Sequence, residues 1–152
     1  MKKTTTSLTE ILMETGLESI KDYFDTYEDS LVAEERPFSA YMRAVFRKKH
    51  VQQQTVFLAA DISEGYGYKL ISEEKRTKQR DVILRLCLAG KFDLKETQTA
   101  LKLYGFAPLY SKVRRDAALI VAINNQMYDI TKVDEYLEMH GFEALYSCRP
   151  AE

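Results

Sequence analysis

Basic side chains gather in one part of the chain, and the chemistry they support is contact with phosphate groups. Four of them stand within ten residues of one another, namely Lys69, Lys75, Arg76 and Lys78. Residues 37–80 carry nine Lys and Arg against four Asp and Glu, a net charge of +5 in a chain whose overall net charge is −1. Because Lys and Arg neutralise nucleic-acid phosphates, this segment predicts double-stranded DNA as a partner.

Residues suited to catalysis or metal binding are sparse. The two histidines, His50 and His140, are both expected at helix ends, and the two cysteines, Cys87 and Cys148, have neither CxxC nor His-linked spacing. Cys87 lies in an apolar helical run and is expected in the core. The sequence also has no phosphate-binding Gly-rich loop and no GxSxG nucleophile motif. We therefore expect no metal, no cofactor and no enzymatic activity.

The elements that must position the basic side chains are two short helices joined by a tight turn within residues 51–72. Asp61 is expected at the bend in a left-handed backbone conformation. Ser63 is expected to cap the second helix, Glu64–Ser72, through its hydroxyl. A pair of this kind offers its second helix to the DNA major groove. Helical spacing predicts that four apolar residues of the pair are buried: Val56, Ala60, Ile62 and Leu70.

The flanking segments have different characters. Residues 38–50 are predicted to form a helix with one apolar face and a basic cluster of Arg43, Arg47, Lys48 and Lys49. Residues 73–80 lack apolar side chains and are expected to be a solvated loop that reaches phosphates. Residues 1–36 form an acidic arm with a net charge of −5, for which we predict two short helices. Packing on the rest of the chain is favoured for this arm, with dimerisation and mimicry of nucleic-acid charge as alternatives.

An internal repeat begins at residue 80. Each copy predicts an apolar helix, a short turn, an Asp that caps a second helix, and a Gly that ends it. Each copy is therefore a helical hairpin, and the shared corners are expected to fix the same packing twice. The matching residues are Arg80-Asp81 with Arg115-Asp116, Asp93 with Asp129, Gly105-Phe106 with Gly141-Phe142, and Leu109-Tyr110-Ser111 with Leu145-Tyr146-Ser147.

These patterns predict an all-α protein. The expected parts are an acidic helical arm (1–36), a DNA-binding domain that includes the first hairpin (37–111), and a second hairpin packed on it (112–152). No apolar run is long enough for a membrane span, and the N-terminus lacks the apolar core of a signal peptide. We therefore expect a cytoplasmic protein without a membrane partner.

Residues 38–104 resemble the XRE-type helix-turn-helix family of the λ Cro and repressor proteins, and the run from Tyr66 is similar to a bacterial branch common in Firmicutes. The resemblance covers about two thirds of the chain. It implies a λ-repressor-like domain of five helices extended by a further helix pair, and transcriptional regulation as a homodimer on a two-fold site. It is carried by Tyr66-Gly67-Tyr68, Arg80-Asp81, Glu96-Thr97-Gln98, the run from Gly105 to Tyr110, and Arg114-Arg115-Asp116-Ala117.

The resemblance also implies which residues meet DNA. Gln53 would hydrogen-bond a phosphate, and the residues facing the DNA would be Ser63, Glu64, Gly65, Tyr68 and Lys69. Phe57 stands where the family usually has a small residue, and Gly67 where it has a branched one. We expect these two positions to touch. The large side chain at position 57 would then fill the space left by the missing side chain at position 67, which conserves packing volume.

The predicted DNA-facing helix is poor in the side chains that usually read bases, which are Arg, Lys, Asn and Gln. Its outward positions hold an acid, a glycine and a tyrosine beside a single lysine. An alternative function follows: a helix-turn-helix scaffold that serves as a protein-interaction or signalling adaptor and does not bind DNA. An apolar surface around Tyr68 would favour the adaptor, and basic neighbours would favour DNA.

Overall fold

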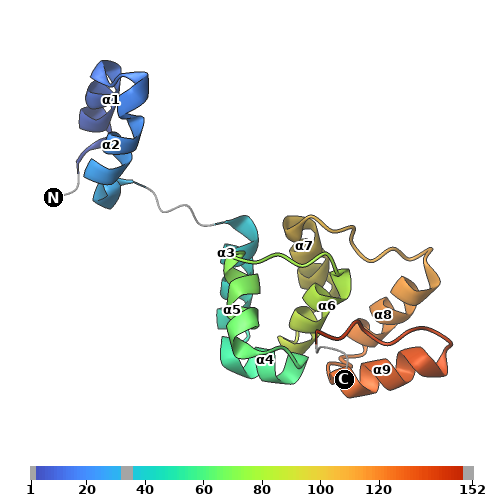
Figure 1. The fold of residues 1–152 in the computed structure, drawn as a ribbon. Helices are drawn as coiled ribbons and strands as arrows, with labels where there is room; N and C mark the ends of the chain where they lie inside the picture. The colour runs from blue at the N-terminus through green and yellow to red at the C-terminus, as the bar shows by residue number, and fades with distance from the viewer. Residues whose placement is uncertain (1–2, 32–35, 149–152) are drawn as a thin grey trace. The chain divides into compact units, whose positions relative to one another are not determined.

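The computed structural model describes residues 3–31 and 36–148, and the regular elements in these ranges are all helical, which confirms the all-α prediction. The chain divides into two compact units, residues 1–34 and residues 35–152. Both are drawn in Figure 1. None of the described helices has the length and apolar character that crossing a membrane requires.

The first unit contains two α-helices, α1 (Thr5–Glu14) and α2 (Ile20–Thr26), with short 3-10 turns at Leu17–Ser19 and Glu28–Ser30. The predicted break between its helices is confirmed, because α1 ends at Glu14 and extended backbone follows. Tyr23 is the buried hydrophobic residue of the described part of this unit. The packing of this segment on the rest of the chain stays a prediction.

The second unit opens with α3 (Pro37–Lys48), α4 (Gln53–Ala60) and α5 (Glu64–Ser72). Pro37 occupies the first turn of α3, where its missing N–H costs no helical hydrogen bond. α3 packs against α5 and also against α7 (Leu94–Tyr104). The buried face of α3 is made of Phe38, Ser39, Met42, Val45 and Phe46.

The bend between α4 and α5 follows the prediction in its backbone and departs from it in one side chain. Asp61 adopts the left-handed conformation, with φ 58° and ψ 44°. Ser63 is the N-cap of α5, but its hydroxyl makes no capping hydrogen bond, so that part of the prediction is wrong. The first turn is closed by the Ser63 carbonyl, which accepts from the Gly67 N–H at 2.8 Å. Ser63 is an exposed residue. The four apolar residues predicted to be buried, Val56, Ala60, Ile62 and Leu70, are all buried.

Two helical hairpins complete the unit, and they match the predicted repeat. α6 (Arg80–Ala89) leads to α7, and α8 (Arg114–Asn124) leads to α9 (Ile130–Met139). Asp93 caps α7 in a reciprocal capping box, and Asp129 caps α9 by accepting from a backbone N–H. Gly105 and Gly141 follow the second helices with φ values of 100° and 82°.

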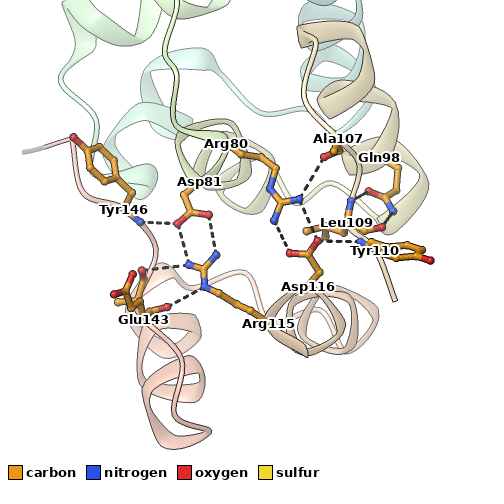
Figure 2. Close-up of polar contacts among 11 residues, drawn as sticks. Arg80, Asp81, Gln98, Ala107, Leu109, Tyr110, Arg115, Asp116, Glu143 and Tyr146 are labelled. Atoms are coloured by element: carbon orange, nitrogen blue, oxygen red, sulfur yellow. Dashed lines mark hydrogen bonds and ion pairs between the residues drawn. The ribbon is translucent and has the colours of Figure 1, made fainter. Parts of the chain in front are cut away.

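The two repeats are joined by reciprocal ion pairs, which Figure 2 shows. Arg80 of the first repeat donates to Asp116 of the second at 2.5 and 3.1 Å, and Arg115 of the second donates to Asp81 of the first at 2.9 and 3.1 Å. Each Asp also accepts a backbone N–H from a repeat corner. Asp116 accepts from Tyr110, and Asp81 accepts from Tyr146. The shared motif therefore fixes the same corner twice, as predicted.

A buried arginine connects the bend after α4 to the C-terminal segment. The guanidinium of Arg85, a residue that is 4% exposed, donates to the carbonyls of Ala60, Leu145 and Tyr146. Figure 1 shows the segment after α9 running back beside α6. The second repeat has Ile120 at the equivalent position, so this bridge belongs to the first repeat alone.

Candidate nucleic-acid interface

The contact between α4 and α5 depends on one aromatic ring and one glycine. A Cβ atom placed on Gly67 would lie 2.5–2.7 Å from three ring atoms of Phe57, so only glycine fits there. Tyr68 then meets the same ring edge-on, with the ring centroids 5.0 Å apart. The predicted contact between positions 57 and 67 is confirmed, and it brings Tyr68 to the surface of the motif.

Three depressions adjoin one another along this surface. The first, of about 470 Å³, joins α3 to the start of α4 and contains Arg43, Arg47, Gln53 and Tyr68. Tyr68 is 43% exposed, and it lines this depression together with the two arginines. Gln53 is the first residue of α4, and a helix start presents backbone N–H groups that favour anions.

The second depression, of about 410 Å³, lies between α4 and the start of α5. Gln54 belongs to both this depression and the first. Its side-chain amide donates to the carboxylate of Glu64 at 3.4 Å. Leu58 forms part of the wall and is 83% exposed.

The third depression, of about 660 Å³, lies between the α4–α5 bend, the loop after α5 and the C-terminal segment. Ser63 and Leu58 line both it and the second depression. Arg76 and Lys78 supply its cationic groups. The three depressions therefore form one track, here called the α4–α5 groove, with two basic side chains at each end and Glu64 in the middle.

The loop at residues 73–80 makes more side-chain contacts with the rest of the fold than the sequence predicts. Glu73 is buried, and its carboxylate pairs with Arg76 at 2.5 Å. Arg76 also donates to the Tyr104 carbonyl, and its guanidinium carbon lies 4.1 Å from the centroid of the Tyr104 ring, over which it stacks. The prediction of a solvated stretch is wrong for Glu73, because the cation and the aromatic ring of α7 give the loop a packed side. Replacing Arg76 would therefore disturb the loop as well as any phosphate contact.

Lys48 and Lys49, two cations of the basic cluster at the end of α3, have a structural partner outside the groove. Lys49 pairs with Glu96 at 2.8 Å, and Lys48 pairs with it at 3.4 Å. Burial by itself would raise the pKa of the Glu96 carboxyl, but hydrogen bonds from Lys49 and from the Asp93 N–H hold that pKa below its usual value. The hydrogen bond to Glu96 in turn raises the pKa of Lys49. The pairs tie α3 to α7.

Most residues expected to face DNA line the α4–α5 groove or border it. Gln53 and Tyr68 lie in the first depression, Ser63 and Glu64 in the second, and Ser63, Arg76 and Lys78 in the third. Three of the predicted residues line none of the three depressions: Gly65 and Lys75 are exposed, and Lys69 is half-buried. A Cβ on Gly65 would meet nothing within 4 Å.

Two groove residues escaped assignment from the sequence. Arg43 and Arg47 were recognised as basic, but their position beside the start of α4 was not. Their i, i+4 spacing indicates that they share one helix face, and only the crossing of α3 and α4 brings that face to the groove.

A ligand set for a metal is absent from the part of the chain that the structure describes: no three His, Cys, Asp or Glu side chains lie together there. Cys87 is buried, and burial raises the pKa of its thiol, as expected of a core cysteine. The chain matches no protein-family model, no curated protein and no solved structure with which it was compared.

Proposed function

We propose that residues 38–104 form a λ-repressor-like helix-turn-helix domain of the XRE type, and that the protein is a sequence-specific DNA-binding transcriptional regulator. One observation carries this proposal: basic side chains stand at both ends of the α4–α5 groove, with α5 between them. Arg43 and Arg47 lie at one end, and Arg76 and Lys78 lie at the other.

This arrangement suits a duplex because phosphate strands border both sides of a major groove about 12 Å wide. Each basic end would contact one strand, and α5 would enter between them. Tyr68, which would decide between DNA and an apolar interface, shares the first depression with Arg43 and Arg47. These two cations support DNA as the partner.

The middle of the groove limits how bases are read. Glu64 can accept from the exocyclic amine of cytosine, and Tyr68 and Leu58 offer apolar surface to a thymine methyl group. Glu64 also repels phosphates. Affinity would therefore come mainly from the basic ends, with a strong dependence on salt.

Fluorescence anisotropy with a labelled random-sequence duplex tests the proposal. Binding should fall steeply between low and near-physiological salt. Arg47→Gln and Lys69→Gln should each weaken binding. Each should also make the negative slope of log K against log salt less steep by about 0.9, which corresponds to the loss of one phosphate contact. Lys132→Gln, which changes an exposed lysine of α9, is the matched control and should change neither quantity.

Two results would contradict the proposal. One is no binding even at low salt. The other is an equal loss in Lys132→Gln and Arg47→Gln, which would mean that the groove has no special part in binding. A search for a specific site and for two-fold symmetry would follow a positive result, because we propose that the protein acts as a homodimer.

The alternative, a protein-interaction or signalling adaptor, is supported by Leu58. This side chain is 83% exposed on α4, and burying it against a partner protein would be favourable. Under this proposal Leu58→Ser would abolish capture of the protein partner, while Arg47→Gln would leave the capture intact. The opposite pattern would exclude an interface centred on α4.

A further inference from the structure

The largest of the three depressions has walls from four separate parts of the chain. They are the α4–α5 bend, the first turn of α5 at Tyr66, the loop at residues 76–79, and the C-terminal segment at Tyr146 and Cys148. Its volume of about 660 Å³ falls within the range of small-molecule sites, which is roughly 300–1,000 Å³.

The walls of this pocket are held in place by contacts behind them. The N–H of Tyr146 donates to Asp81 at 2.9 Å, and its carbonyl accepts from Arg85 at 2.6 Å. On the opposite side the N–H of Thr77 donates to the Tyr104 hydroxyl at 2.7 Å. Because the protein's own atoms make these contacts, the fold fixes the walls of the pocket, which lowers the cost of binding.

The lining combines an apolar body with a positive charge. Phe57, Leu58 and Tyr66 offer apolar and aromatic surface, and the charged side chains of the lining are the cations Arg76 and Lys78 and the carboxylate of Asp61. Arg76 already pairs with Glu73, so Lys78, which is exposed, is the better placed to meet a ligand. These features fit an organic anion with an aromatic ring system.

We propose that this pocket is an effector site that binds a small aromatic anion, and that the anion and DNA exclude each other. The exclusion rests on the proposed function, because Ser63, Arg76 and Lys78 line the pocket and are also expected to contact DNA. An anion that pairs with the Lys78 ammonium group would leave it unable to pair with a DNA phosphate. By linkage, each ligand weakens the other by the same factor.

The test uses the full-length protein and 8-anilinonaphthalene-1-sulfonate, an aromatic anion whose fluorescence rises in apolar sites. Cys148 serves as a reporter because it lines the pocket, whereas Cys87 is 0% exposed. Alkylation by iodoacetamide is followed by intact mass. Burial raises the pKa of the Cys148 thiol, so the reaction is run at about pH 8.5, where a free thiol is substantially ionised.

The anion should protect Cys148. At ten times its dissociation constant, alkylation should slow about tenfold, since only the empty pocket reacts. Lys78→Gln should raise the dissociation constant by about fivefold, the upper end for one exposed ion pair. Lys75→Gln removes an exposed lysine of the same loop that does not line the pocket, and it should leave the constant unchanged.

The DNA arm separates the two proposals. The anion at the same excess should raise the apparent dissociation constant for the duplex by about tenfold. If the anion protects Cys148 from alkylation but the protein binds no DNA, the proposed anion site stands and the proposed function is refuted. DNA binding without protection of Cys148 would refute the pocket. Fluorescence that rises without protection, no fluorescence at all, or equal effects of the two lysine variants would also refute it.

Discussion

At the scale of single residues, the surface of the motif depends on the pairing of Phe57 with Gly67. The ring fills the space that a side chain at position 67 would occupy, and it supports Tyr68 from below. A glycine inside a helix lowers its stability relative to alanine. Here that cost is offset by the close approach of α4 and α5, which sets the shape of the α4–α5 groove.

We therefore predict that Gly67→Ala is destabilising although alanine is the better helix former. The new Cβ would lie 2.5 Å from the Phe57 ring, and overpacking of this kind costs about 2 kcal/mol. Gly65→Ala is the matched control on the same helix. Its Cβ meets nothing within 4 Å, so it should raise the free energy of unfolding by about 0.5 kcal/mol. Urea denaturation measures both.

A second substitution tests the cause. Phe57→Leu with Gly67→Ala should recover part of the loss, because the smaller side chain makes room for the methyl group. Equal stabilities of Gly67→Ala and Gly65→Ala would show that the ring moves away freely, and that the packing of α4 on α5 is loose.

At the scale of elements, the two hairpins are joined by the motif that they share. The Arg of each repeat pairs with the Asp of the other repeat, and each Asp also accepts a hydrogen bond from the backbone N–H of a corner tyrosine. The two aspartates nevertheless differ in environment. The Asp116 side chain is 4% exposed, and that of Asp81 is 16% exposed. Less solvent means less screening of an ion pair and a higher cost when one partner is removed.

We predict that Asp116→Asn lowers the free energy of unfolding by about 3 kcal/mol, the loss expected for a buried ion pair left with one charge. Asp81→Asn, which changes the equivalent residue of the other repeat, should cost less than half as much. Both measurements use urea denaturation of the full chain. A larger loss for Asp81→Asn would mean that the corner at Tyr146, rather than ion-pair burial, controls the joint.

At the scale of the whole molecule, residues 35–152 form a unit with a complete core. The buried cluster draws its members from Phe38 to Leu145. The unit at residues 1–34 has Tyr23 as the buried hydrophobic residue of its described part. Chains of about that length seldom supply enough buried surface to fold alone.

We predict that a variant beginning at Arg36 folds on its own. Its free energy of unfolding should lie within about 1 kcal/mol of the full chain, because the apolar burial that stabilises it is retained. A peptide of residues 1–34 should show little helical circular dichroism at 25 °C. Loss of cooperative unfolding in the variant would show that the first unit supplies stability to the second.

The sequence by itself determined the local elements. It predicted the bounds of α5, the left-handed bend at Asp61, the Asp caps at 93 and 129, and the glycines that end α7 and α9. It also predicted the contact of Phe57 with Gly67, through the family resemblance. Helix bounds and caps follow from neighbours a few residues apart, so the order of residue types specifies them.

Only the tertiary structure decided what lies around the groove. Arg80 pairs with Asp116, which lies 36 positions further along the chain. Arg76 contacts Tyr104, 28 positions further along, and the burial of Glu73 depends on such long-range contacts. The first depression needs Arg43 and Arg47 from α3, and the third needs the segment held by Arg85. A pattern along the chain reports which face of a helix is apolar. Which faces then meet depends on packing between elements, and packing sets the place of each charge at the surface.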